Sequence, residues 1–420
     1  MRRRITHTLV FAAVAALATQ AQAQQAGTTQ RVTQPVYQAA NGENIPAYAS
    51  QYAATADGNG YDGSPVGYYD EEPQATRELG VEQVANLTYQ PQQADATATD
   101  TTSSQIGSGN CCPTSCCQTS CCTPFWVHRN SVFFDFLVLK PRNADVANAV
   151  PQNGIGPTAV PFGNVGSNSP TYQPGFRVGG TMAINRCSSL YAAYTYFQAE
   201  SNGSTFANPP LVVHSLVTLP QTGTAASDGP AALSRDAIRF QFADIDYRRL
   251  IAGGNNWYVN YAVGARYANL YQMFSQAQVN GPTITGVGTR IGMDALGTRV
   301  GLLAARKAAN RGFYMYGSAF ADILVGNFRA SYVQLNNLAG VQGFNNWQNF
   351  RPVPILEYEL GAGWRSPNGN WQFSGGYYFA CWFNAITTSN YIQSVQNNNF
   401  VGVGNAITFD GLVLRAQRLW

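Results

Sequence analysis

Alternation of apolar residues with small or polar residues, at a period of two, is the feature that most constrains this fold. It recurs through residues 126–420, most clearly in "FRVGGTMAIN" (176–185) and "WYVNYAVGARYANL" (257–270). One face of each segment is aliphatic and aromatic, whereas the other is small or polar and carries Arg177 or Arg266. This pattern predicts β-strands with one face against an apolar phase, which is either a protein core or lipid.

Connection lengths separate these two alternatives. We expect about ten strands, near 131–140, 174–185, 188–200, 236–252, 257–275, 289–307, 312–333, 353–366, 370–387 and 405–420. Short turns (186–187, 253–256, 308–312, 367–370) then alternate with longer loops (141–173, 201–235, 276–288, 334–352, 388–404). This alternation is typical of outer-membrane barrels and gives a soluble β-sandwich no advantage. The sequence predicts an all-β, transmembrane antiparallel β-barrel of about ten strands, with twelve as the alternative.

The N-terminal region has a different character. In residues 1–23, three arginines precede the apolar run from Leu9 to Ala18, and Ala21-Gln22-Ala23 follows; this is the pattern of a secretory signal peptide. Residues 24–110 hold two basic and ten acidic residues, are rich in Gln, Ala and Thr, and show no sustained periodicity. We expect this segment to be a disordered acidic extension, because it cannot bury enough apolar surface to fold.

Segment 111–125 contains six of the eight cysteines, as three adjacent pairs that repeat every five residues. The spacing is a poor match to zinc sites, so we expect no metal. Adjacent cysteines rarely bridge each other, and disulfides persist after export. Bridges within the segment or to Cys187 are one alternative, bridges between copies are another, and a soft-metal site is a weaker third. The candidates are Cys111, Cys112, Cys116, Cys117, Cys121, Cys122 and Cys187.

Charged residues on the small, polar strand faces are the candidates to line a lumen. A charge that faces lipid at mid-membrane costs about 2–4 kcal/mol, so these side chains should point inward. They would either pair into ladders that fill the barrel or leave a positive lumen that favours anions. The candidates are Arg177, Arg266, Arg299, Arg329, Asp244, Asp246, Asp322, Glu357 and Glu359.

Several segments resemble the Legionella-type pore-forming outer-membrane protein family. They are "SVFFDFLVLKPRNADVANAV", "GFRVGGTMAINRCSSLYAAYTYFQAES", "FADIDYRRLI", "RVGLLAARKAANRGFYMYGSAFADILVGNFRASY" and "ITFDGLVLRAQ". The resemblance covers roughly 126–420 and rests mainly on the order of these segments. It implies an outer-membrane barrel that forms a pore, and it implies no catalytic residues. The N-terminal extension and the paired cysteines depart from the usual family pattern.

The expected function is a passive pore for small solutes, anions among them. The alternative is a structural envelope protein, cross-linked through cysteines, with a barrel filled by its own side chains. We expect no enzyme activity and no cofactor, because His128 and His214, the histidines beyond the signal peptide, are not at strand ends among catalytic partners.

The expected location is the outer membrane, with the N-terminal extension in the periplasm. The expected partners are outer-membrane lipid, the barrel-insertion machinery and further copies of the chain, as a homo-oligomer or a disulfide-linked lattice, with no nucleic acid. The C-terminal Trp420 is the candidate insertion signal, because many outer-membrane barrels end in an aromatic residue that closes the last strand.

Overall fold

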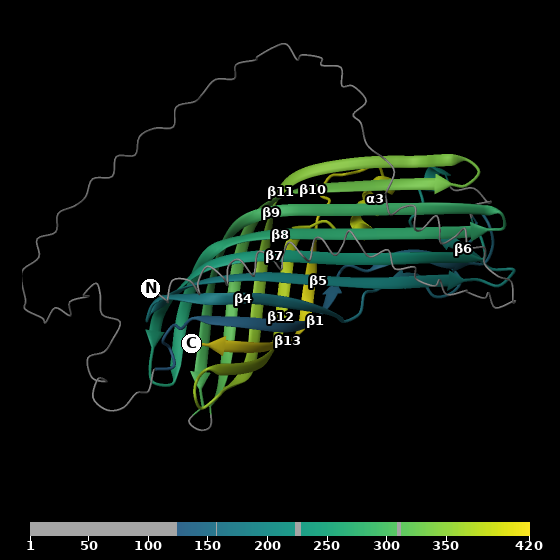
Figure 1. The fold of residues 1–420 in the computed structure, drawn as a ribbon. Helices are drawn as coiled ribbons and strands as arrows, with labels where there is room; N and C mark the ends of the chain where they lie inside the picture. Colours follow the sequence, from purple (N-terminus) through teal and green to yellow (C-terminus); the bar gives the residue numbers. More distant parts are fainter. Residues whose placement is uncertain (1–123, 157, 223–227, 309–311) are drawn as a thin grey trace, which may run out of the picture. The chain divides into compact units, whose positions relative to one another are not determined.

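The computed structural model describes residues 124–156, 158–222, 228–308 and 312–420. In these ranges ten antiparallel strands close into a barrel, in the order β1-β13-β12-β11-β10-β9-β8-β7-β5-β4 (Figure 1). The predicted β-barrel is therefore confirmed, with ten strands and not twelve. The barrel strands are β1 (Ser131–Arg142), β4 (Gln173–Asn185), β5 (Ser188–Phe206), β7 (Ala231–Gly253), β8 (Trp257–Asn280), β9 (Thr283–Lys307), β10 (Phe313–Asn336), β11 (Gly340–Arg365), β12 (Trp371–Ala385) and β13 (Asn405–Leu419).

The two ends of the barrel differ. Ser131 at the start of β1 pairs with Leu419 near the end of β13, so these two strand ends lie at one end, which we name the terminal end. The short connections 186–187, 254–256 and 366–370 lie there too, as do the end of β9 at Lys307 and the start of β10 at Phe313. The opposite end, which we name the loop end, carries the remaining connections.

An apolar belt surrounds the outer surface. Alternate residues of β8 from Trp257 to Tyr267 point outward, and on β10 the outward Ile323 and Val325 are 64% and 46% exposed. Ten residue steps at ~3.3 Å, tilted by ~40°, give a height of about 25 Å, which matches the apolar band of outer-membrane barrels. A row of outward polar residues borders the belt toward the loop end: Gln241, Asn269, Asp294 and Asn327.

Two of the expected long loops are instead strand. Residues 276–288 and 334–352 extend β8–β9 and β10–β11, which are joined only by 281–282 and 337–339. These strands extend beyond β1, β12 and β13 at the loop end (Figure 1). The polar residues that made the segments resemble loops face inward: Gln276 and Gln278 are buried, and Gln278 Nε2 donates a hydrogen bond to the Val213 carbonyl (2.6 Å).

The remaining connections at the loop end fold inward. The strands β2 (Val146–Gln152), β3 (Gly166–Asn168) and β6 (Val212–Ser215) form a small sheet, and η1 (Pro220–Thr222) follows it. The helix α3 (Thr388–Gln396) is capped at its N-terminus by Thr387, whose side chain accepts a hydrogen bond from the Asn390 amide. Tyr391 and Ile392 of α3 join the main buried apolar cluster. None of the helices in the described ranges is long and apolar enough to cross a membrane.

Candidate lumen site

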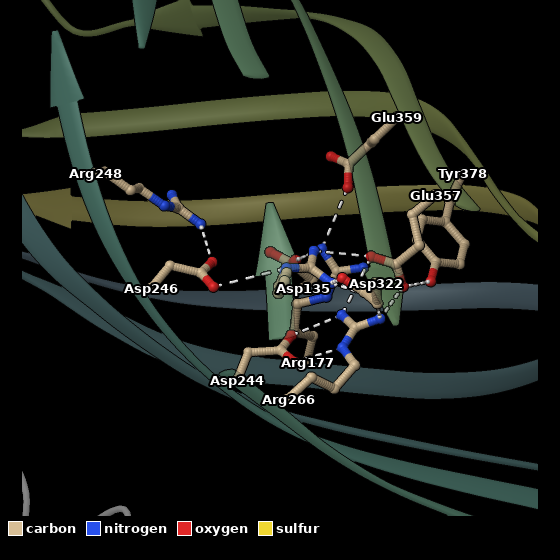
Figure 2. Close-up of polar contacts among 11 residues, drawn as sticks. Asp135, Arg177, Asp244, Asp246, Arg248, Arg266, Asp322, Glu357, Glu359 and Tyr378 are labelled. Carbon is tan, nitrogen blue, oxygen red and sulfur yellow. Dashed lines mark hydrogen bonds and ion pairs between the residues drawn. The ribbon is translucent and has the colours of Figure 1, made fainter. Parts of the chain in front are cut away.

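Arg266 lies at the centre of an ion-pair cluster inside the barrel. Its guanidinium donates two hydrogen bonds to Asp244 (2.6 and 2.8 Å), two to Glu357 (2.6 and 3.1 Å) and one to Asp322 (2.8 Å). The three carboxylates come from β7, β11 and β10, and of these only β7 is a neighbour of β8. Arg266 is only 2% exposed; it pairs with Asp244 on the neighbouring strand and reaches past β9 to Asp322 and Glu357 (Figure 2).

Arg299 of β9 extends the same cluster. It bonds to Asp322 (3.1 Å) and Glu357 (2.8 Å), its Nε lies 3.7 Å from Asp246, and its guanidinium lies over the Phe320 ring at 3.8 Å. Asp322 and Glu357 thus each contact both Arg266 and Arg299. Sharing charges in this way offsets part of the cost of burying them, which a single isolated pair does poorly.

A second group of charges lies across the lumen. Arg415 of β13 binds Asp135 of β1 through two hydrogen bonds (2.7 and 2.8 Å). Arg177 of β4 lies 3.4 Å from Asp135 and 3.2 Å from Glu359. Tyr378, whose hydroxyl donates to Glu357 (2.7 Å), lies with its ring 5.3 Å from the Arg177 guanidinium and so connects the two groups. Charged residues from most barrel strands therefore meet in one layer.

Eight of the nine sequence candidates lie inside the barrel in this layer. They are Arg177, Arg266, Arg299, Asp244, Asp246, Asp322, Glu357 and Glu359. Whether they line an open pathway stays a prediction.

The inward placement of Arg329 was wrong. It is exposed on the outer face of β10, beyond the apolar belt. Asp322 and Arg329 are seven positions apart in one regular strand, an odd number, so they must face opposite sides of the sheet.

Sequence reasoning missed several members of the layer, namely Asp135, Arg248, Arg415, Tyr316 and Tyr378. A signal for Asp135 was present in "VFFDFLV". There, the carboxylate alternates with Phe134 and Phe136, which are outward and 49% and 44% exposed. No such local signal marks Tyr378, because its role depends on contacts across the lumen.

An aromatic cluster lies inside the barrel on the loop-end side of the charged layer. The Phe242 ring lies 4.0 Å from the Arg266 guanidinium and stacks on Trp382 at 5.1 Å. Phe240 and Phe409 pack against these rings at 4.9–6.0 Å and against each other at 4.6 Å. Trp382 is fully buried inside the barrel. In β12, Trp382 occupies one of the alternate positions that face the lumen, whereas Trp371 and Phe373 face outward.

On the other side of the charged layer, toward the terminal end, lies a cavity of about 210 Å³. The Phe125 ring lies at this cavity and packs against Tyr258 (5.3 Å) and Tyr314 (5.9 Å). Arg129 and Arg365 also line it. Both donate hydrogen bonds to the Gly369 carbonyl, and Arg129 donates another to the Asn370 side chain, so neither is bonded to a carboxylate among the described residues. The cavity is therefore cationic at its entrance and ends at the ion-pair layer.

His128 and His214 hydrogen-bond to Ser189 and Asp228, which are not members of the charged layer. His214 in β6 contacts Asp228 at 2.7 Å, and this hydrogen bond raises the pKa of His214. Burial near the terminal end lowers the pKa of His128 to about 4. Cys187 is buried in the β4–β5 turn, also at the terminal end.

The candidates Cys111, Cys112, Cys116, Cys117, Cys121 and Cys122 lie outside the described residues, as do the expected signal peptide and acidic extension. Trp420 is 51% exposed beside β1, where its amide donates to the Asn130 carbonyl, and its role in insertion stays a prediction.

Comparisons with solved structures give weak likenesses. The outer membrane protease OmpT from Escherichia coli is 11% identical, with a TM-score of 0.40, over 72% of this chain and 99% of that chain. A FadL homologue from Pseudomonas aeruginosa is 8% identical with a TM-score of 0.19, over 69% of this chain and 89% of that chain. The toluene transporter TodX from Pseudomonas putida is 6% identical, with a TM-score of 0.18 and the same coverages. Scores this low carry no argument about function.

The family comparison is more informative. No curated protein matches the chain. The family described as "Legionella pneumophila major outer membrane protein precursor" matches residues 123–411, well over half of the chain, from just before β1 into β13. The resemblance noted in the sequence is therefore confirmed at the level of the family. This chain belongs to the Legionella major outer membrane protein family and is an outer-membrane β-barrel protein.

Proposed function

We propose that this protein is a structural outer-membrane barrel whose lumen is closed in its resting form. The observation that carries the proposal is the ion-pair layer around Arg266 and Arg299, which crosses the lumen with both side chains nearly fully buried. The aromatic cluster of Phe242 and Trp382 lies directly against it. A hydrated ion would have to displace both layers to pass.

The electrostatics of the layer also favour closure over anion selectivity. Basic rings select anions in pores when their charges face water. Here Arg177, Arg266 and Arg299 are each paired with two or more carboxylates. The layer offers a passing anion no unpaired positive charge, which supports the role as a filler that the sequence left open.

A passive pore remains the second candidate, and the cavity at the terminal end favours it. Arg129 and Arg365 would attract small anions to that entrance. In this second proposal the ion-pair layer is a gate that must rearrange before solutes cross. Neither proposal includes catalysis.

The structural role would place the N-terminal extension in the periplasm, since β1 begins at the terminal end, where outer-membrane barrels have their short turns. Disulfides formed by the cysteines of segment 111–125 would then link barrels to one another on that side. Loss of covalent oligomers on substitution of these six cysteines by serine, in the native envelope, would test this part of the proposal.

Single-channel conductance of residues 24–420 in a planar bilayer separates the two candidates. Closure predicts no steady steps from protein whose insertion is verified by protease protection. The variant Arg266→Ala/Phe242→Ala/Trp382→Ala removes the inner aromatic pair together with the arginine at the centre of the ion-pair layer, and we expect it to conduct. The control Trp371→Ala/Phe373→Ala removes an outward pair stacked at 6.1 Å and should stay silent. Steady steps from the unmodified protein would reject closure and favour the pore.

A further inference from the structure

We propose that three outward-facing arginines at the loop-end edge of the apolar belt bind the phosphates of lipid A, the anionic membrane anchor of lipopolysaccharide. They are Arg239 of β7, Arg290 of β9 and Arg329 of β10, and we name them the outer arginine patch. The proposal takes the loop end as the external side, as above. It does not depend on whether the lumen is open.

Strand register brings the three residues together. Arg239 is directly opposite Tyr271, Tyr271 is opposite Gly292, and Gly292 is opposite Arg329. One cross-strand row therefore runs from Arg239 to Arg329. Arg290 is opposite Met273 and Ser331, and it lies two residues further along β9 toward the loop end than Gly292. Sequence separation hides this grouping, because the residues are up to ninety positions apart and only register aligns them.

The spacing suits a phosphorylated headgroup. Neighbouring strands are ~4.8 Å apart and diagonal neighbours ~7–8 Å apart. Arg290 and Arg329 are therefore diagonal neighbours, and Arg239 is about 14 Å from Arg329, three strands away. The patch is thus wide enough for more than one phosphate. Arginine presents paired N–H donors that match phosphate oxygens, which lysine does not do.

The patch is an unneutralised cationic surface. In the described ranges no carboxylate lies within ion-pair distance of Arg239, Arg290 or Arg329, and Arg239 Nε is buried without a hydrogen-bond partner. Other outward arginines of the same rim do have partners: Arg142 pairs with Asp410, and Arg235 with Glu200.

Asp294 is the carboxylate in the adjacent row, and its position matters for the charge of the patch. It accepts hydrogen bonds from the Tyr267 hydroxyl and the Asn269 amide, each at 2.8 Å. The hydrogen bonds of Asp294 are therefore directed toward β8 and the apolar belt, and its carboxylate forms no ion pair with Arg329.

Gly292 makes a recess in the middle of the row. A Cβ built there would have the Tyr271 ring as its nearest neighbour, at 4.0 Å, and no other atom within that distance, so the outer surface at Gly292 is open. The Arg239 guanidinium lies 5.1 Å from the Tyr271 ring centroid, a cation–π contact that holds it at the edge of this recess. A phosphate in the recess would have arginines on both sides.

The apolar belt below the patch indicates a lipid in place of a free anion. Leu296 of β9 and Val325 of β10 are 59% and 46% exposed, on the outer face just below this rim. A lipid with its phosphates on the patch would lay its acyl chains along these side chains. Basic residues at such an edge attract anionic lipid headgroups, and lipid A is the phosphate-bearing lipid of the outer leaflet.

Native mass spectrometry of the detergent-purified full chain tests the proposal by counting retained lipids after exchange with a defined probe. The probes are lipid A, dephosphorylated lipid A and phosphatidylglycerol. The test variant is Arg239→Gln/Arg290→Gln/Arg329→Gln. The control, Arg306→Gln/Arg418→Gln, makes the same change to outward arginines at the terminal end. Heat-modifiable electrophoretic mobility verifies folding of each protein.

We expect retention of lipid A by the unmodified chain and by the control, with retention about tenfold lower in the triple variant. The unmodified chain should retain dephosphorylated lipid A no better than the triple variant retains lipid A. Equal retention of lipid A by the triple variant would overturn the site, and stronger retention of phosphatidylglycerol would overturn the assignment to lipid A. If the triple variant folds poorly, Arg329→Gln alone, at the most exposed position, should lower retention about threefold; no change there would equally reject the proposal.

Discussion

Replacing Arg266 by alanine should be among the most destabilising single changes in the barrel. The guanidinium contributes five hydrogen bonds to Asp244, Asp322 and Glu357. The alanine variant would leave these three carboxylates facing one another in a buried layer, with only Arg299 close by. The cost therefore comes from uncompensated charge more than from lost contacts.

Removing one member of a buried ion pair typically costs about 3–5 kcal/mol in unfolding free energy. Arg266 borders the terminal-end cavity, so water can solvate part of the exposed charge, and we expect the lower half of that range. Arg235→Ala is the matched control, because the side chains of Arg235 and Glu200 are 45% and 40% exposed. Such a surface pair contributes less than about 1 kcal/mol. The two variants should differ by roughly 30-fold or more in the unfolding equilibrium.

Reversible urea unfolding in lipid vesicles measures this difference, with tryptophan fluorescence for the barrel and heat-modifiable mobility for the folded fraction. The slope of unfolding free energy against urea must be the same for all three proteins, so that the midpoints compare stability alone. A loss below about 1 kcal/mol for Arg266→Ala, or an equal loss for Arg235→Ala, would refute the argument that removing Arg266 leaves uncompensated buried charge.

Two further predictions follow from other parts of the barrel. Gly264→Ala should lower the free energy of unfolding by about 1–3 kcal/mol through overpacking, because the new Cβ would lie 2.0 Å from the Ile245 carbonyl oxygen. Gly286→Ala is the control, because no atom lies nearer than 3.9 Å to its Cβ, and it should cause no such loss. The midpoints of urea unfolding compare the two variants. The raised pKa of His214 beside Asp228 means that the protonated form is favoured on folding, so this stabilisation is present below about pH 6.5 and is lost as pH rises through the folded-state pKa. Hydrogen exchange at the β6 amides should therefore speed up above that pH, beyond its intrinsic increase, and His214→Gln should abolish the effect; a pH-independent difference would contradict the assignment.

A polar layer inside a barrel follows from the constraint on its outer face. Lipid requires the outward positions to be apolar, so charge in these strands must point inward. Ten strands enclose little free space, so inward side chains meet across the lumen. Once buried, each charge needs a partner, which is why Arg299 and Glu357 contact each other from strands that are not neighbours.

The sequence alone determined the face of nearly every strand residue. Period-two alternation is local, so it can be read without knowing which strands pair, and the turn residues set the strand count. Where the prediction failed, as for Arg329, strict alternation of faces along the strand would have corrected it. The extensions of β8–β11 were missed because their inward residues are polar, so no apolar face marked them as strand.

Only the tertiary structure decided which inward charges meet. Arg266 and Glu357 are ninety-one residues apart and three strands apart in the ring, and their contact depends on the diameter and stagger of the closed barrel. The same holds for the outer arginine patch, which exists because register aligns β7 to β10, and for the loops that fold over the loop end. Alternation assigns each side chain to a face, but closure of the sheet assigns its neighbours, and neighbours determine whether a charge opens a lumen or fills it.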